Sequence, residues 1–205
     1  MTTARHLMII AMEDEAPDRP VDRGDLSLAL AGAELIDLLA ARTVTLDDER
    51  VVPGDPPSTS DSLLEQAASS LVREAPHESV DAWLWRRGRD LSSTYVAAFK
   101  AEGQLTRQSR RGLSFRSGPA VLTDSADHRA AASRWASAEP TLVALATAVG
   151  IPGPGGDDGE DSRSTGDDTV DTVVAAVHEA LTELDAIRQR RAIEQAAFDN
   201  IWRGE

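Results

Sequence analysis

The residue types best suited to catalysis or metal binding are four histidines and one acidic run. His6, His77, His128 and His178 fall on four different predicted elements, and none has a second ligand at a metal-binding spacing. The acidic run at 157–161 lacks the alternating oxygen ligands and closing glutamate of an EF-hand loop. The chain has no cysteine, which excludes thiolate catalysis and the common structural zinc sites. We therefore expect no metal site and no cofactor.

The sequence also lacks the short motifs of nucleophilic and nucleotide-dependent enzymes. Its serines are numerous, yet none lies in a nucleophile-elbow context with a histidine placed as base. The glycine-rich stretch 150–156 does not end in the Lys-Ser/Thr pair of a phosphate-binding loop. A pair of catalytic carboxylates leaves no local spacing, and nothing here points to one. The expectation is a protein that is not an enzyme.

Basic side chains are concentrated in one part of an acidic chain. The formal charge of the 205 residues is −14, but residues 86–116 hold eight basic and two acidic side chains, a net of +6. The basic members are Arg86, Arg87, Arg89, Lys100, Arg107, Arg110, Arg111 and Arg116. This island is either a contact surface or a solvated face that balances acidic neighbours. The acidic total argues against nucleic acid as a partner.

The elements that must position these residues are mostly helices. Aromatic residues make up only 4% of the chain, so the core depends on aliphatic residues and alanine, which suit close helix packing. Apolar spacing predicts helices at 4–12, 24–42, 60–71, 78–86, 90–102, 122–138, 141–149 and from 168 onward, although the length of 4–12 alone would also allow a strand. Two hairpins are predicted, one pairing 43–46 with 50–52 and one pairing 105–106 with 112–116. The fold class is mainly α, a single helical domain with two small β-hairpins.

Composition divides the chain into three parts. Residues 1–151 form the expected helical core, and 152–168 form a disordered acidic insertion rich in Gly, Asp, Pro and Ser. Residues 169–205 form a C-terminal helix that packs on the core, although the apolar pattern restarts after 188–191, so its last turns either dock separately or pair with another chain. No apolar run approaches the length of a membrane span. We expect a cytoplasmic protein, with any membrane contact peripheral and on the inner face.

The succession of several segments resembles the Golgi phosphoprotein 3 family, in the form of its actinobacterial paralogues. These segments are Leu-Met-Ile-Ile-Ala-Met-Glu-Asp-Glu at 7–15, Leu-Ala-Gly-Ala-Glu-Leu-Ile-Asp-Leu at 30–38, the loop and helix at 56–64, Trp83, and Lys-Ala-Glu-Gly-Gln-Leu at 100–105. The similarity spans about 5–151 and more loosely the last helix. It implies a helical, non-catalytic peripheral membrane protein, because the eukaryotic members bind phosphatidylinositol 4-phosphate on a basic face.

The resemblance also implies a head-group pocket. In the family it uses a Trp and an Arg near the start of the second helix and an Arg-x-x-Arg pair further on. Here Arg89 matches the first arginine of that pair, the second position reads Ser92, and the 21–24 loop has no Trp. Because a phosphorylated inositol needs several converging cations, the candidate lipid-binding residues are Arg89, Arg86, Arg87, Arg23 and Arg19, and they must converge to serve. The alternative is that Arg89 pairs with a neighbouring acid such as Asp90 or Glu102.

The second hairpin is the other implied contact surface. The resemblance assigns it oligomer contacts, so a homo-oligomer through this hairpin is expected beside the anionic lipid partner. Its candidate contact residues are Arg107, Arg110, Arg111, Leu113 and Phe115. The basic tip would also be attracted to an anionic leaflet.

Two other functions remain open at this point. One is a soluble scaffold in which an ancestral lipid site has decayed. The other is a winged-helix-like DNA-binding regulator, since a helix, a glycine turn and a basic hairpin also describe a recognition helix and wing. The acidic total, together with Asp90 and Glu102 near that helix, counts against DNA binding.

Overall fold

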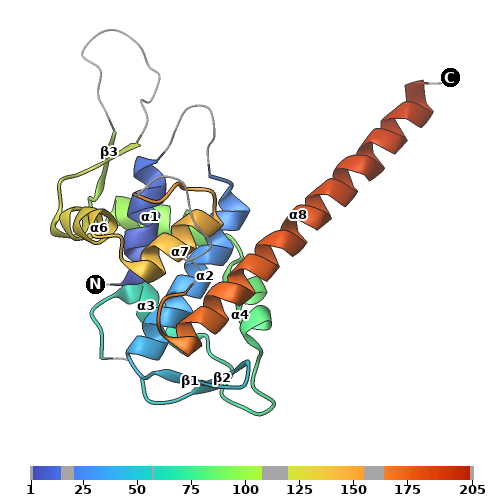
Figure 1. Cartoon of the computed structure of the whole chain (residues 1–205). Helices are drawn as coiled ribbons and strands as arrows, with labels where there is room; N and C mark the ends of the chain where they lie inside the picture. Colours follow the sequence, from blue (N-terminus) through green and yellow to red (C-terminus); the bar gives the residue numbers. More distant parts are fainter. Residues whose placement is uncertain (1, 15–20, 57, 108–119, 155–163, 204–205) are drawn as a thin grey trace, which may run out of the picture.

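The computed structural model describes residues 2–14, 21–56, 58–107, 120–154 and 164–203 (Figure 1). In these ranges the chain forms eight helices: α1 (Thr3–Glu13), α2 (Arg23–Ala40), α3 (Ser62–Ser69), α4 (Val80–Arg87), α5 (Leu91–Ala101), α6 (Ala126–Ala136), α7 (Pro140–Ala148) and α8 (Asp168–Arg203). Four short strands accompany them: β1 (Val44–Asp47), β2 (Arg50–Pro53), β3 (Leu105–Arg107) and β4 (Ala120–Leu122). The predicted mainly α fold is confirmed.

Helix α1 lies inside the molecule, enclosed by α2, α6 and α7 (Figure 1). All of its residues from Thr3 to Ala11 are buried. A helix that is apolar over most of its circumference can be stable only in such a place. Its polar side chains and its N-terminal N–H groups must therefore find partners inside the protein.

Those partners come from several elements. The backbone N–H groups of Thr3 and Ala4 donate to the two carboxylate oxygens of Asp37 on α2, at 2.8 and 3.1 Å. The buried guanidinium of Arg5 forms ion pairs with Glu102, with Asp127 at 3.5 Å and with Asp61 at 3.7 Å. Three carboxylates offset the cost of burying one charge.

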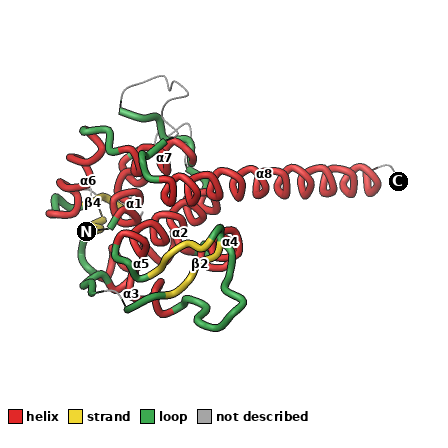
Figure 2. Tube along the Cα trace, turned by 60° about the horizontal axis from the view of Figure 1, so that its bottom comes forward, coloured by secondary structure: helices red, strands yellow, loops and turns green. Residues whose placement is uncertain are grey.

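Helix α2 is central to the fold, because it packs against α1, α4, α5 and α8. Asp22 caps its start by accepting from the N–H groups of Gly24 and Asp25. The first half of α8 packs on α2 through Val173, Val177 and neighbouring residues. Its outer half extends away from the body (Figures 1 and 2), where Ile193 is 70% exposed. The last turns of α8 thus continue one straight helix and, among the described residues, do not dock on the core.

The two hairpins agree with the sequence to different degrees. Strands β1 and β2 pair as predicted, with Val44 opposite Pro53. Strand β3 pairs with β4, so residues 105–107 face 120–122 instead of the expected 112–116, which lie outside the described residues. The helix expected from 122 begins at Ala126, because Leu122 belongs to β4 and Ser125 caps α6 by accepting from the N–H of His128.

The expected disordered insertion at 152–168 is only partly described, since 155–163 fall outside the described ranges. Its last residues form a turn against the start of α8. The N–H of Thr165 donates to Asp171 at 2.7 Å, and Asp167 accepts from Thr169 at 2.8 Å. These local hydrogen bonds order a stretch that composition alone assigns to disorder. No helix in the described part of the chain is long and apolar enough to cross a membrane.

His6 is a buried, neutral group of the α1 core. Its Nδ1 accepts from the Arg134 guanidinium at 2.9 Å, while its buried Nε2 has no hydrogen-bond partner among the described residues. Burial, reinforced by the charge of Arg134, lowers the pKa of His6 to about 4. Asp37 behaves oppositely, because burial raises the pKa of its carboxyl to about 6.

His6 should make the fold acid-sensitive. An unfolded chain protonates this histidine below pH 6.5, whereas the folded chain resists until about 4, so its contribution to stability is lost as pH falls between these values. In the wild-type chain the raised pKa of Asp37 changes stability in the opposite direction over the same pH range. The contribution of His6 is therefore isolated by comparison with the variant His6→Gln, which keeps Asp37. Urea unfolding at pH 7, 5.5 and 4 should show the wild type losing up to about 3 kcal/mol relative to the variant. Parallel stability curves for the two proteins would contradict this.

Candidate functional site

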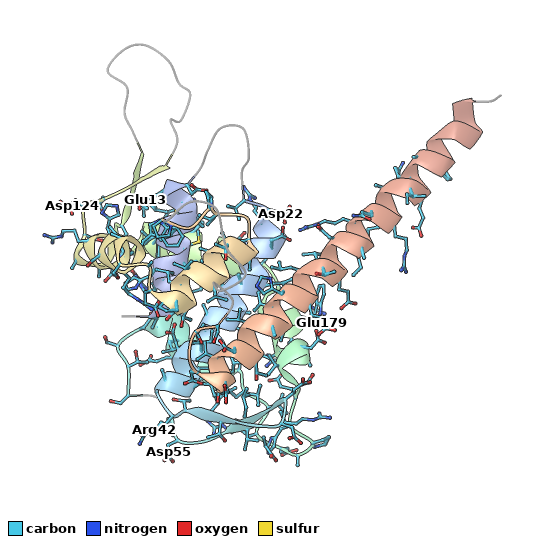
Figure 3. All side chains as sticks on the ribbon, viewed as in Figure 1. Glu13, Asp22, Arg42, Asp55, Asp124 and Glu179 are labelled. Atoms are coloured by element: carbon cyan, nitrogen blue, oxygen red, sulfur yellow. The ribbon has the colours of Figure 1, made fainter. Side chains whose placement is uncertain are left out.

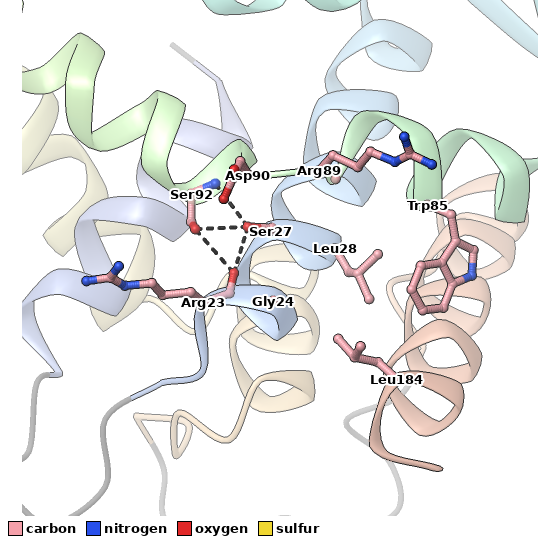
Figure 4. A pocket seen from close by; sticks show the side chains of 10 residues that line it. Arg23, Gly24, Ser27, Leu28, Trp85, Arg89, Asp90, Ser92 and Leu184 are labelled. Carbon is pink, nitrogen blue, oxygen red and sulfur yellow. Dashed lines mark hydrogen bonds between the residues drawn. The ribbon is translucent and has the colours of Figure 1, made fainter. Parts of the chain in front are cut away.

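A surface pocket of about 240 Å³ lies where the start of α2, the junction of α4 with α5 and the middle of α8 meet (Figure 4). Helix α2 contributes Arg23, Gly24, Ser27 and Leu28. The junction contributes Trp85, Gly88, Arg89, Asp90 and Ser92, and α8 contributes Leu184. Residues separated by up to 161 positions in the sequence thus share one site.

Two buried serines hold the floor of the pocket together. The backbone N–H of Ser92, at the start of α5, donates to Ser27 Oγ on α2 at 3.1 Å. Ser27 Oγ lies 2.6 Å from the carbonyl oxygen of Arg23, and the two hydroxyl oxygens lie 2.9 Å apart (Figure 4). Asp90 makes no side-chain cap for α5, so Ser27 satisfies a donor that the helix start leaves unpaired. This contact joins the start of α2 to the start of α5.

The turn between α4 and α5 brings Arg89 to the same place. Gly88 follows α4 directly, and a Cβ there would lie 3.3 Å from the backbone oxygen of Ser27 and 3.2 Å from Leu28 Cδ2. The end of α4 therefore rests on α2 with no room for a side chain. Asp90 then takes a left-handed conformation with φ 54°, which reverses the chain into α5. Arg89 is the exposed residue between these two constraints.

Arg23 and Arg89 are the cationic side chains of the pocket. Both are exposed, and neither makes an ion pair within the described ranges. Figure 4 shows them extending in opposite directions, with Arg89 on the side of Trp85. Between them, Leu28, Trp85 and Leu184 supply an apolar wall, and Asp90 adds one negative charge. The pocket thus combines two cations at its edges with an aromatic surface.

Arg86 and Arg87 do not line this pocket. Arg86 pairs with Glu78, at 2.6 Å, and its guanidinium lies over the Trp83 ring. Arg87 forms a two-pronged pair with the fully buried Glu34, at 2.7 and 2.9 Å. Arg19 lies outside the described residues.

The Arg87–Glu34 pair belongs to the core. Burial raises the pKa of Glu34, and the hydrogen bonds and charge of Arg87 act against that shift. The Tyr95 hydroxyl donates to the same carboxylate at 3.1 Å. A buried acid whose oxygens are occupied in this way needs its arginine, so Arg87 has no freedom to bind a ligand.

The alternative in which Arg89 pairs with a neighbouring acid is not found, since no ion pair within the described ranges joins Arg89 to Asp90 or Glu102. Glu102 pairs with Arg5 instead. In the second hairpin, Arg107 is placed only as backbone of β3, and Arg110, Arg111, Leu113 and Phe115 lie outside the described residues. The hairpin contact surface stays a prediction.

Among the residues lining this pocket, Trp85 and Ser27 were not singled out from the sequence, and Ser92 was noted only as the position where the family has its second arginine. A signal for Trp85 was present, because it follows the core residues Trp83 and Leu84 and so falls off the buried face of α4. The resemblance places a tryptophan before the second helix. Here the indole comes from α4 and meets the start of that helix only in three dimensions. Ser27 carries no distinguishing local pattern.

A protein-family model matches most of the chain. The family model described as Golgi phosphoprotein 3 (GPP34) matches residues 4–184, which includes every residue lining the pocket. A search of curated proteins finds no match. Within the described ranges, no group of three His, Asp or Glu side chains is arranged to hold a metal ion.

Arg87 and Arg89 should differ sharply in their effect on stability. Arg87→Leu leaves Glu34 buried without its cation, and we expect a loss of about 3 kcal/mol or more in the free energy of unfolding. Arg89→Leu, the matched control, removes an exposed side chain that forms no ion pair with any described residue, and it should change the free energy of unfolding by less than about 0.5 kcal/mol. Urea denaturation of both variants at neutral pH tests this. Equal destabilisation would mean that Arg89 also has a structural role.

Proposed function

The chain belongs to the Golgi phosphoprotein 3 family, and on this premise we propose that it is a non-catalytic peripheral membrane protein that binds phosphorylated lipid head groups. The expected ligand is phosphatidylinositol 4-phosphate, and the expected site is the pocket between α2, the α4–α5 junction and α8. The observation that carries this is that two exposed arginines, Arg23 and Arg89, which form no ion pair within the described part of the chain, lie beside an indole-lined pocket.

Binding at this pocket would proceed by rotation of two free side chains. A guanidinium donates two parallel hydrogen bonds to phosphate oxygens, and these charge-assisted bonds are among the strongest in proteins. Because Arg23 and Arg89 are exposed and make no ion pair with the residues that the structure describes, turning them toward a phosphate breaks none of the ion pairs seen there. The apolar wall of Leu28, Trp85 and Leu184 would cover the carbon face of the head-group ring.

The acidic chain makes a general attraction to anionic bilayers a poor explanation for binding. With a net charge of −14, the protein as a whole is repelled from an anionic leaflet, and only local cations act within the short screening length of physiological salt. We therefore expect selectivity for a phosphomonoester head group over equal charge carried by phosphatidylserine.

A soluble scaffold with a decayed lipid site is the second candidate function. The divergent directions of Arg23 and Arg89 and the acid Asp90 in the pocket favour it. DNA binding receives less support, because α5 carries Lys100 as its single basic residue and buries Leu91, Tyr95 and Phe99 against the core.

Vesicle sedimentation separates the two candidates. Phosphatidylcholine vesicles containing phosphatidylinositol 4-phosphate should bind the full chain, whereas vesicles of equal charge made with phosphatidylserine should bind it weakly. Arg23→Gln and Arg89→Gln should each lower affinity about tenfold, as expected for one lost charge-assisted contact.

The matched control is Arg73→Gln, which removes one exposed charge that lies away from the pocket and forms no ion pair with the described residues, and it should leave binding unchanged. Absence of binding to every vesicle at low salt would reject the membrane role and favour the scaffold. An equal loss in all three variants would instead indicate unspecific charge attraction.

A further inference from the structure

Arg188 of α8 joins this helix to the start of α2. Its Nη1 lies 2.7 Å from Asp25 Oδ1 and 3.2 Å from Asp185 Oδ1, and its Nη2 pairs with Asp22. Figure 3 shows Asp22 beside α8. The ion pairs to Asp22 and Asp25 span more than 160 residues of sequence, so they exist only because α8 crosses the end of α2.

The two helices meet at the edge of the pocket. Gly24 lies between the two acids, and a Cβ at this position would come within 2.9 Å of Arg188 Nη2 and 3.2 Å of Leu184 Cδ2. Leu184, one turn before Arg188, forms the α8 wall of the pocket. Thus the ion pairs of Arg188 set the approach of that wall to α2.

The ion pairs of Arg188 also determine whether Arg23 has an acidic partner. Asp22 and Asp25 lie on either side of Arg23 in the first turn of α2 and are its nearest acids in sequence. Both are occupied by Arg188, while Arg23 makes no ion pair within the described ranges. Without Arg188, two carboxylates would be available to pair with Arg23 and would repel an incoming phosphate.

We propose that Arg188 is a positioning residue for the pocket: by occupying Asp22 and Asp25 it keeps Arg23 available for an anionic ligand, and it holds Leu184 at the pocket wall. This inference deepens the proposed head-group binding and rests on it for its ligand. Arg188 does not line the pocket and is not expected to touch the phosphate.

The first test is a mutant cycle on binding to vesicles containing phosphatidylinositol 4-phosphate. Arg188→Gln should weaken binding about fivefold, as expected for one partly screened charge near the ligand. In the Asp22→Asn/Asp25→Asn background, the same change should have almost no effect, because the acids it would release are gone. Asn retains the capping ability of Asp22, so the background keeps the start of α2. Unchanged binding in Arg188→Gln, or an equally large loss in both backgrounds, would overturn the proposal.

The second test needs no lipid and reads the charge of the pocket through Trp85. Replacing Trp135 and Trp202 by Phe leaves Trp85 and the fully buried Trp83. Quenching by iodide, measured relative to neutral acrylamide, should fall in Arg188→Gln and recover when both acids are also changed to Asn. Failure of the wild-type chain to bind vesicles would reject the proposed function alone, since this ratio still reports the role of Arg188. An unchanged ratio would reject that role.

Discussion

The burial of α1 is the constraint on which the rest of this structure depends. An enclosed helix cannot leave its N–H groups or its charged side chains without partners. Asp37 of α2 accepts from the start of α1, and Arg5 gathers carboxylates from three separate parts of the chain. These polar contacts set the position of α2 against α1, and each of the other helices packs against one of these two.

Helix α2 connects this buried region to the surface pocket. Its inner turns carry Glu34 and Asp37, which are committed to buried partners, whereas its first turn carries Arg23 at the pocket. Arg87 and Arg89 show the same division between a core position and a surface position. Arg87 completes the core, and Arg89, two residues later, follows the turn at Gly88 and remains exposed. A difference of two positions at a helix end thus separates a structural cation from one available to a ligand.

How far the site can be predicted from the sequence depends on the range of each contact. Helices α1, α2 and α5 follow from apolar spacing within a few positions, and the first hairpin follows from two short β-prone runs on either side of an acidic turn. The partner of β3 was placed wrongly, because three-residue strands carry too little alternation to define their register. Trp85 could not be assigned to the pocket from the sequence, because its distance from the start of α2 depends on how α4 crosses that helix.

The sequence by itself determined the helical class, the family resemblance and the presence of a basic segment within an acidic chain, since these depend on composition and short-range pattern. Only the tertiary structure decided which cations are held in ion pairs. Arg86 and Arg87 lie in that segment but are paired with Glu78 and Glu34, while Arg23 and Arg89 line one pocket from opposite sides. Ion pairing depends on separations of a few ångströms between side chains far apart in sequence, and no local pattern records them.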